Sequence, residues 1–359
     1  MVAAPPPQDA VLSSAADPFV TEGGQAITNL TLRFEAHGTL NATGDNAMMV
    51  FHGLGRGGHL AGSYDAATFG GLSVYEQGLG PHGMWTDLVG PGQALDTDHL
   101  FIVSPNSLGG CHGSTGPTSI NPATGQPYGS DFPELTIRDM VRAHARLAQY
   151  LGIRRLRVMG PSFGGMQALE FAIMFPELTS GLCCICMLDK HTLWSKGLNP
   201  VALGIIRRDP AFQDGRYQQQ PESLAVAWAV LLPMLRTPES FKERWRDHPP
   251  NEPSGLLHEA RRYAAAFDAN TFILLTTAAD GHDIARERGP VETVLGSLAM
   301  PRLFVAIDTD QLFSPQEIKA LSDAAGGDYV AINSIHGHIA AMVEQEQMTP
   351  IIRRFVLSS

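Results

Sequence analysis

The sequence is poor in charge, short of basic residues and without a long apolar run. Charged residues make up 17% of the 359 positions, and 25 Lys and Arg stand against 36 Asp and Glu, which gives a net charge of −11. Nucleic-acid-binding proteins carry a basic patch or stripe, so this balance argues against a nucleic-acid partner. No segment approaches the roughly 18 apolar residues that a membrane-spanning helix needs. The hydrophobic content of 44% predicts instead a globular protein with a large core.

Cysteine is also scarce, with four residues in the chain. Cys183, Cys184 and Cys186 stand in one apolar run, residues 181–188, which we interpret as a buried strand. Adjacent side chains on a strand point to opposite faces, so neighbouring thiols there cannot easily form a disulfide. Their spacing does not match a metal site either. We therefore predict reduced core thiols and no bound metal.

The N-terminal stretch lacks the features of a targeting signal. Residues 1–18 are rich in Ala and Pro, without a cationic start or an apolar core of signal-peptide length. This composition predicts a disordered tail over residues 1–25 and a cytoplasmic location.

What the sequence does contain is a nucleophile motif. Residues 160–164 read G-x-S-x-G, with Ser162 at the centre, between a strand-like run and a helix-like run. In that setting the motif makes a tight strand-to-helix turn, which raises the serine hydroxyl above the edge of a sheet. The flanking Gly160 and Gly164 would let the two backbones approach closely. The bare pattern recurs by chance in Gly-rich chains, so its weight depends on this setting.

A candidate acid and a candidate base follow Ser162 in the chain. Asp310 comes after a strand-like run at 303–307, and His338 comes after another at 328–335. Open α/β sheets place functional groups on loops at the carboxyl ends of parallel strands. A serine hydroxyl needs an imidazole to take its proton, and a carboxylate must orient that imidazole. The sequence therefore predicts a triad of Ser162, Asp310 and His338.

Both partners have a neighbour of the same type. Asp308 precedes Asp310 by two positions, and we favour Asp310 because Asp308 continues the strand and can cap the turn after it. His336 likewise precedes His338, and we favour His338 because Gly337 allows a sharp turn just before it. A metal site at these histidines would need Cys or acidic partners at ligand spacing, which the sequence does not offer.

Acyl transfer also needs backbone N–H donors aimed at the developing oxyanion. Phe163, directly after the nucleophile, is the first predicted donor. The second should come from a loop after an early strand, and residues 52–59 form a Gly-rich loop after the strand-like run 47–51. Leu54 is the predicted donor in that loop. A merely flexible Gly-rich connection is the alternative, whereas a phosphate-binding loop would need a G-K-[ST] ending that is missing.

Further runs resemble the homoserine O-acetyltransferase family of α/β-hydrolase-fold enzymes. The resemblance covers roughly residues 25–356 and rests on residues 106–111 (NSLGGC), 113–117, 120–125, 128–133 (YGSDFP), 136–141 (TIRDMV), 164–170 (GGMQALE), 208–210 and 267–270. These motifs are typical of the family rather than of the fold in general.

The resemblance implies an α/β-hydrolase fold: a mostly parallel central sheet, helices on both faces and an inserted helical lid. The core would comprise residues 26–190 and 291–359, and the lid residues 191–290, where Pro, Trp and Arg become frequent and strand-like runs fade. It also implies that Ser162 takes an acetyl group and passes it to a hydroxyl. Acetyl-CoA would then be a co-substrate and not a bound cofactor. A homodimer is expected by the same resemblance.

The acceptor site departs from the family pattern. The family usually carries a Tyr-Arg pair on a lid helix, whose arginine binds the carboxylate of the amino acid. Here Pro233 and Met234 occupy those positions, and only a two-residue shift would recruit Arg236. Ile339 stands where the family usually has an Asp after the catalytic His. Met234, Arg236 and Ile339 are thus the predicted substrate contacts.

These departures favour hydrolysis of a small ester, because a buried zwitterion without counter-charges would suffer a desolvation penalty of several kcal/mol. The alternative is an O-acetyltransferase that moves acetyl from acetyl-CoA to homoserine or another small alcohol. A catalytically silent binding protein is disfavoured, because every triad and oxyanion position holds a competent residue.

Overall fold

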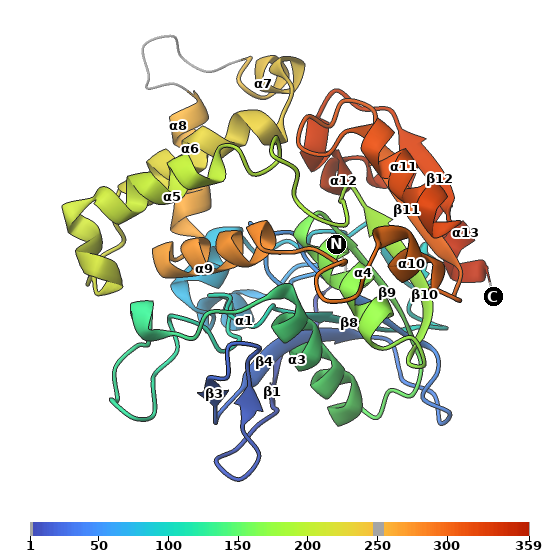
Figure 1. The fold of residues 1–359 in the computed structure, drawn as a ribbon, viewed down its shortest axis with the longest axis horizontal. Coiled ribbons are helices and arrows are strands. Elements are labelled where there is room, and N and C mark those ends of the chain that lie inside the picture. Colours follow the sequence, from blue (N-terminus) through green and yellow to red (C-terminus); the bar gives the residue numbers. More distant parts are fainter. Residues whose placement is uncertain (1–2, 247–254, 359) are drawn as a thin grey trace.

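The computed structural model describes residues 3–246 and 255–358. Its centre is an eight-stranded sheet in the order β1-β4-β8-β5-β9-β10-β11-β12 (Figure 1). The pairs β1–β4 and β4–β8 are antiparallel, and the other pairs are parallel. The strands are β1 (Gln8–Val11), β4 (Thr31–His37), β8 (Phe101–Pro105), β5 (Ala47–Val50), β9 (Leu156–Pro161), β10 (Thr179–Ile185), β11 (Arg302–Ile307) and β12 (Asp328–Ile332). The mostly parallel sheet predicted from the sequence is confirmed.

Side chains of the central strands alternate between two hydrophobic cores. Met49 and Cys184 belong to one core, and their neighbours Met48 and Cys183 belong to the other. All four cysteines are free and buried. Because both faces of the sheet are covered, these strands are continuous apolar runs in the sequence rather than alternating ones.

Helices cover both faces of the sheet. The first core takes residues from α3 (Ile137–Tyr150), α4 (Phe163–Met174), α10 (Val291–Gly296) and α11 (Pro315–Ala325). The second takes residues from α12 (Ala340–Val343) and α13 (Gln345–Leu357). The expected arrangement of helices on both faces is therefore present.

The N-terminal segment differs from the tail predicted for residues 1–25. Strand β1 pairs with β4 at the edge of the sheet, and β2 (Phe19–Val20) pairs with β3 (Ala26–Ile27). The Phe19 side chain is buried under the guanidinium groups of Arg142 and Arg146, at 5.2 and 5.5 Å from the ring centroid. The prediction of a disordered tail was wrong because composition does not show which segments pair through their backbones. Here the Ala- and Pro-rich segment forms β1, which pairs with β4.

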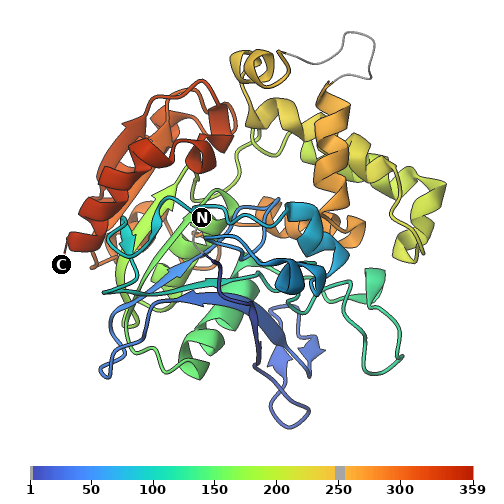
Figure 2. The ribbon, with the colours of Figure 1, turned by 180° about the vertical axis from the view of Figure 1, so that it is seen from behind.

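Between β10 and β11 the chain leaves the sheet. Within the described residues of 191–290, the regular structure is helical apart from an isolated bridge between Lys190 and Asp283. Figure 2 shows these helices, yellow to orange, gathered together on one side of the molecule. Beside that bridge, Ile284 N–H donates to Asp189 O at 3.3 Å, so the two ends of the segment meet. The helices are α5 (Asn199–Arg208), η2 (Pro210–Gly215), α6 (Ser223–Leu235), α7 (Pro238–Arg244), α8 (Gly255–Ala265) and α9 (Ala269–Asp280).

Short elements complete the structure. They are α1 (Ala66–Gly70), α2 (Val74–Leu79), β6 (Val89–Gly90) with β7 (Leu95–Asp96), η1 (Gly129–Asp131) and η3 (Gly337–Ile339). In the part of the chain that is described, no helix combines the length and the apolar character needed to cross a membrane.

Candidate active site

Ser162 occupies the turn between β9 and α4. Its backbone has φ 54° and ψ −122°, a conformation that side-chain-bearing residues rarely adopt and that costs on the order of 1–3 kcal/mol. The turn is held by Ser162 N–H, which donates to Ile185 O at 2.8 Å, and by Met166 N–H, which donates to Ser162 O at 3.0 Å. The structure therefore presents the serine on a strained turn, as the motif predicts.

Two glycines make this turn possible. A Cβ on Gly160 would lie 2.6 Å from the carbonyl carbon of Gly164, and a Cβ on Gly164 would lie 2.2 Å from Phe51 O. Both contacts are far inside van der Waals distance. The motif needs glycine at these positions for reasons of space.

His338 and Asp310 form a buried pair. His338 Nδ1 lies 2.8 Å from Asp310 Oδ2, and the two side chains are 7% and 0% exposed. The other carboxylate oxygen, Oδ1, accepts from Leu312 N–H at 2.8 Å and from Phe313 N–H at 3.2 Å. The backbone N–H groups of Leu312 and Phe313 thus hold the Asp310 carboxylate in place while its other oxygen orients the imidazole.

The two neighbouring candidates have other partners. Asp308 Oδ1 accepts from Ser334 N–H at 2.9 Å, which ties together the loops after β11 and β12. His336 Nδ1 lies 3.1 Å from Ser240 Oγ, on the first turn of α7. Neither residue takes part in the His338–Asp310 pair.

The surroundings of His338 favour its protonated form. Burial by itself lowers the pKa of the imidazole, but the charge and hydrogen bond of Asp310, together with Cys186 beside the ring, outweigh burial and hold the pKa of His338 well above its ordinary value. An imidazolium formed by proton transfer from serine would therefore be stabilised in place.

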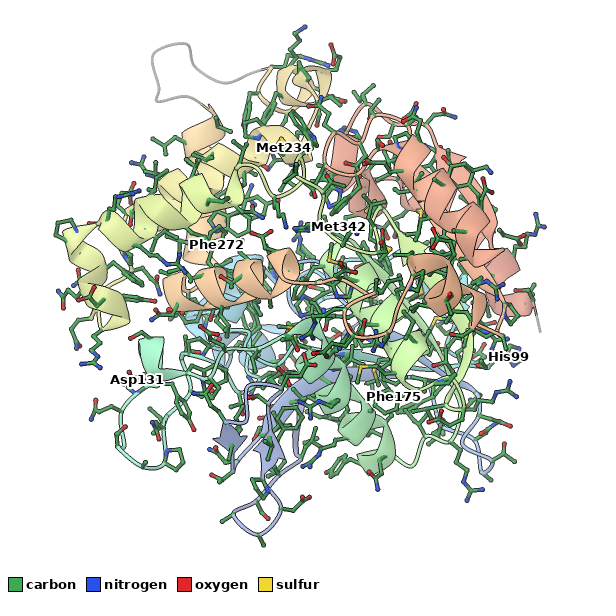
Figure 3. All side chains as sticks on the ribbon, in the orientation of Figure 1. His99, Asp131, Phe175, Met234, Phe272 and Met342 are labelled. Atoms are coloured by element: carbon green, nitrogen blue, oxygen red, sulfur yellow. The ribbon has the colours of Figure 1, made fainter. Side chains whose placement is uncertain are left out.

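Ser162 and His338 open into a cavity of about 120 Å³. Met234 of α6 and Met342 of α12 both line it, and Figure 3 labels both, with Met234 among the helices of residues 191–290 and Met342 nearer the middle of the molecule. The other predicted residues that line the cavity are Leu54, Phe163 and Ile339. Within the described residues Ser162 Oγ forms no hydrogen bond with His338, and such bonds are often long before substrate binds.

The loop that carries Leu54 is anchored at two points. His52 Nδ1 donates to Gly53 O at 2.8 Å, while its Nε2 accepts from Ser107 N–H at 3.1 Å. Burial lowers the pKa of His52 to about 3, so the ring is neutral, as one donor and one acceptor require. Farther along, Gly58 N–H donates to Asn106 Oδ1 at 2.5 Å. These contacts fix the loop beside the N-terminus of α4, where the N–H of Phe163 lies.

Arg236 does not line the cavity that holds Ser162 and His338, contrary to the prediction that it contacts the substrate. Helix α6 ends at Leu235, and Arg236 follows in an extended conformation (φ −137°, ψ 150°) that takes its side chain away from the cavity. Its guanidinium is buried and donates to Glu259 at 2.7 Å and to Ser240 at 3.2 Å.

A basic hollow of about 320 Å³ adjoins the cavity. Arg56, on the loop after β5, lines both spaces. Arg236, Arg244 and Arg262 line the hollow with Glu259, and Glu259 forms ion pairs with the first two of these arginines. The hollow therefore carries a net positive charge.

Sequence reasoning missed several polar residues of the cavity. Cys186, interpreted as a core thiol, lines the cavity with φ 42°. Its sulfur and one ligand atom each of Asp310 and His338 lie within 4.8 Å of one another, a spacing compatible with a metal ion. His191 also lines the cavity, and its place just beyond β10 was the available signal, because functional groups gather at the carboxyl ends of parallel strands.

A strand, a strained serine turn and a helix beside a buried His–Asp pair define the α/β-hydrolase class. A family model described as alpha/beta hydrolase fold matches residues 46–340 of the chain, in agreement with that geometry.

Within this class the chain belongs to the homoserine O-acetyltransferase family, which confirms the resemblance found in its motifs. A homoserine O-acetyltransferase from Thermus thermophilus is 43% identical over 353 residues, which cover 98% of this chain and 92% of the relative. It follows that the chain is an acyl-transferring enzyme.

Two solved structures are similar along nearly the whole chain. The homoserine O-acetyltransferase from Bacillus anthracis matches with a TM-score of 0.86 and 25% identity, covering 100% of this chain and 99% of its own. Esterase E22 matches with a TM-score of 0.85 and 27% identity, covering 98% and 100%. Proteins named for acetyl transfer and for ester hydrolysis therefore share this fold closely.

Proposed function

We propose that Ser162, His338 and Asp310 form a catalytic triad that hydrolyses a small ester through an acyl-serine intermediate. The observation that carries the proposal is the cavity beside Ser162, whose wall is apolar at Met234 and Ile339. The family's acceptor charges would be expected at these two positions.

The chemistry follows from the residues that line the cavity. Ser162 Oγ attacks the ester carbonyl while His338 takes its proton, and Asp310 stabilises the imidazolium that results. The oxyanion of the tetrahedral intermediate accepts hydrogen bonds from the N–H groups of Phe163 and Leu54. The C–O bond to the alcohol then breaks, and His338 returns the proton to the leaving alcohol. Water repeats the sequence on the acyl-serine, which releases the acid and frees Ser162.

Water is favoured over an amino-acid acceptor for an electrostatic reason. A zwitterion that enters the cavity gives up its hydration, and only paired counter-charges offset that cost. Arg236 is held by Glu259 and Ser240, and Met234 and Ile339 carry no charge. A neutral acceptor meets no such penalty.

A specific observation favours a second candidate, an O-acetyltransferase that uses acetyl-CoA as co-substrate. The hollow lined by Arg56, Arg244 and Arg262 adjoins the cavity and would suit the phosphate groups of such a donor. In this case the acyl-serine is the same and an alcohol, homoserine among others, takes the place of water.

The test is intact mass spectrometry of the protein after mixing with p-nitrophenyl acetate or with acetyl-CoA, with and without homoserine. The proposal expects acetylation of Ser162 by the nitrophenyl ester and loss of the label at a rate that homoserine does not change. Loading by acetyl-CoA with unloading by homoserine would establish the second candidate instead.

The matched control is Ser162→Ala, which should acquire no label and lose at least about a thousandfold in turnover. Labelling of the Ser162→Ala protein at another residue would show that the nucleophile is misassigned.

A further inference from the structure

A second imidazole–carboxylate pair lies at the wall of the catalytic cavity. His191 follows β10, and its Nδ1 lies 2.8 Å from Oδ1 of Asp280, the last residue of α9. Asn199 Nδ2 donates to the same oxygen at 2.8 Å. Since a carboxylate can only accept, His191 Nδ1 carries the proton, and Nε2 lies on the opposite edge of the ring. His191 and Asn199 line the cavity, with Asp280 behind them.

Thr276 adds an unpaired polar group to the same wall. It stands one helical turn before Asp280, so the two residues share a face of α9. Its side chain is 1% exposed and lines the cavity, and its Oγ1 has no hydrogen-bond partner among the described residues. Buried hydroxyls are normally paired, so a ligand that reaches Thr276 would satisfy it.

This wall lies close to the catalytic base. The Phe313 ring packs against both histidines, with its centroid 5.5 Å from that of His191 and 5.6 Å from that of His338. A substrate held at Ser162 and His338 can therefore extend toward His191 and Thr276 within one cavity.

We propose that His191, Thr276 and Asp280 form a subsite that binds a hydroxyl group on the non-reacting part of the substrate. The hydroxyl donates to Nε2 of His191 and accepts from the Thr276 hydroxyl, which satisfies the unpaired Thr276 side chain. Asp280 acts through His191, whose tautomer it fixes. This inference rests on the proposed acyl transfer at Ser162 and names the class of substrate: esters that carry a further hydroxyl.

A carboxylate fits this subsite less well than a hydroxyl. Asp280 already places a negative charge behind the imidazole, and a second anion would be repelled. Arg236 is occupied by Glu259, and Arg56 lies on the loop after β5, where it also borders the basic hollow. The wall formed by His191 and Thr276 therefore suits a neutral group.

The first experiment compares 2-hydroxyethyl acetate with ethyl acetate, two esters that differ by one hydroxyl. The unmodified protein should prefer the hydroxylated ester in kcat/KM by about fivefold or more, the effect of about one neutral hydrogen bond. Thr276→Val and His191→Phe should each remove most of this preference, chiefly through KM, and Thr276→Ser should restore it. Thr277→Val is the matched control, because Thr277 is the next residue on α9 and is exposed.

The second experiment measures binding without turnover. In the Ser162→Ala protein, calorimetry should show tighter binding of 2-hydroxyethyl acetate than of ethyl acetate, and adding Thr276→Val should remove the difference. Equal binding of the two esters would overturn the subsite, as would a stronger response to an ester that carries a carboxylate instead. Tighter binding of 2-hydroxyethyl acetate, together with no turnover of either ester by the unmodified protein, would support the subsite and would contradict the proposed hydrolysis.

Discussion

At the residue scale, Asp308 and Asp310 stand two positions apart and have different partners. Asp310 holds the His338 imidazole, whereas Asp308 holds the backbone of Ser334. The sequence could order these candidates because strand length and turn chemistry are local properties. The place of His191 beyond β10 was an available signal, but Thr276 and Asp280 carried none, because their proximity to His191 depends on how α9 packs against the segment after β10.

Asparagine substitutions separate the two aspartates. In Asp310→Asn the amide oxygen can still accept from Leu312 and Phe313, but the charge that supports the imidazolium is lost. We expect turnover of p-nitrophenyl acetate to fall by about a thousandfold or more. Asp308→Asn keeps an acceptor for Ser334 and should cost less than about tenfold. The reverse ranking would identify Asp308 as the triad acid.

The pH profile follows from the raised pKa of His338. The imidazole must be neutral to take the serine proton, so kcat/KM should fall as the pH drops through a pKa above the ordinary value of about 6.5. Asp310→Asn removes the main raising influence and should move this acidic limb to lower pH. The raised pKa of His338 also stabilises the folded protein at a pH below the pKa of this histidine in the unfolded state. This stabilisation is lost as the pH rises through its pKa in the folded state. If Asp310→Asn does not move the acidic limb of the kcat/KM profile, that limb reports the titration of a group other than His338.

At the element scale, the turn from β9 into α4 depends on glycine. Gly164→Ala would place a methyl group 2.2 Å from Phe51 O, so the helix must move away from the sheet. We expect destabilisation of about 1–3 kcal/mol or more in urea unfolding and a large loss of turnover. Gly296→Ala is the control, because nothing lies within 4 Å of its added Cβ and its backbone is unstrained. Equal effects of the two changes would argue against the close approach at Ser162.

The end of α6 determines which side chains reach the cavity. Met234 lies on the helix and lines the cavity, while Arg236 lies beyond the helix and turns toward Glu259. The sequence read in register placed Pro233 and Met234 at the family positions, and only a two-residue shift would have brought Arg236 to the cavity. The structure shows no such shift. The pairing of β1 with β4 could not be predicted in this way, because it depends on a partner more than a strand length away in the chain.

Restoring the missing charges tests the acceptor site. The double substitution Met234→Arg with Ile339→Asp puts opposite charges on the cavity wall, and it should raise the fraction of acetyl-serine that homoserine captures. The two single variants serve as controls, because each supplies one of the two counter-charges. Product analysis measures the fraction of acetyl-serine that homoserine captures. If this fraction does not increase in the double variant, other residues exclude the amino acid.

At the scale of the whole molecule, one buried carboxylate joins distant parts of the chain. Glu170 on α4 is fully buried and pairs with Arg138 on α3 and with Arg288, which precedes α10. Glu22, near the N-terminus, pairs with Arg286 in the same connection. The family resemblance of its motifs implied the layers of this fold, but these ion pairs depend on tertiary packing and carry no local signal in the sequence.

Removing the charge of Glu170 should therefore destabilise the whole protein. Glu170→Gln leaves Arg138 and Arg288 short of their buried partner, and we expect a loss of about 3–5 kcal/mol in urea unfolding. Glu287 also pairs with Arg138, at 3.5 Å, but its side chain is 76% exposed, so Glu287→Gln should cost less than about 1 kcal/mol. If the two variants lose similar amounts of unfolding free energy, burial does not make the Glu170 ion pairs more important for stability than the exposed pair of Glu287.

The contact between Lys190 and Asp283 has a consequence for how this architecture can diversify. The described residues between those two positions lie outside the sheet, and the two ends of the segment meet where Ile284 N–H donates to Asp189 O. The intervening helices can accordingly vary while Ser162 and Asp310 keep their bonds to Ile185, Leu312 and Phe313. The loop that carries His338 would have to adapt with them, because His336 contacts Ser240 of α7. A new preference for a leaving group would then arise from different helices on the same sheet.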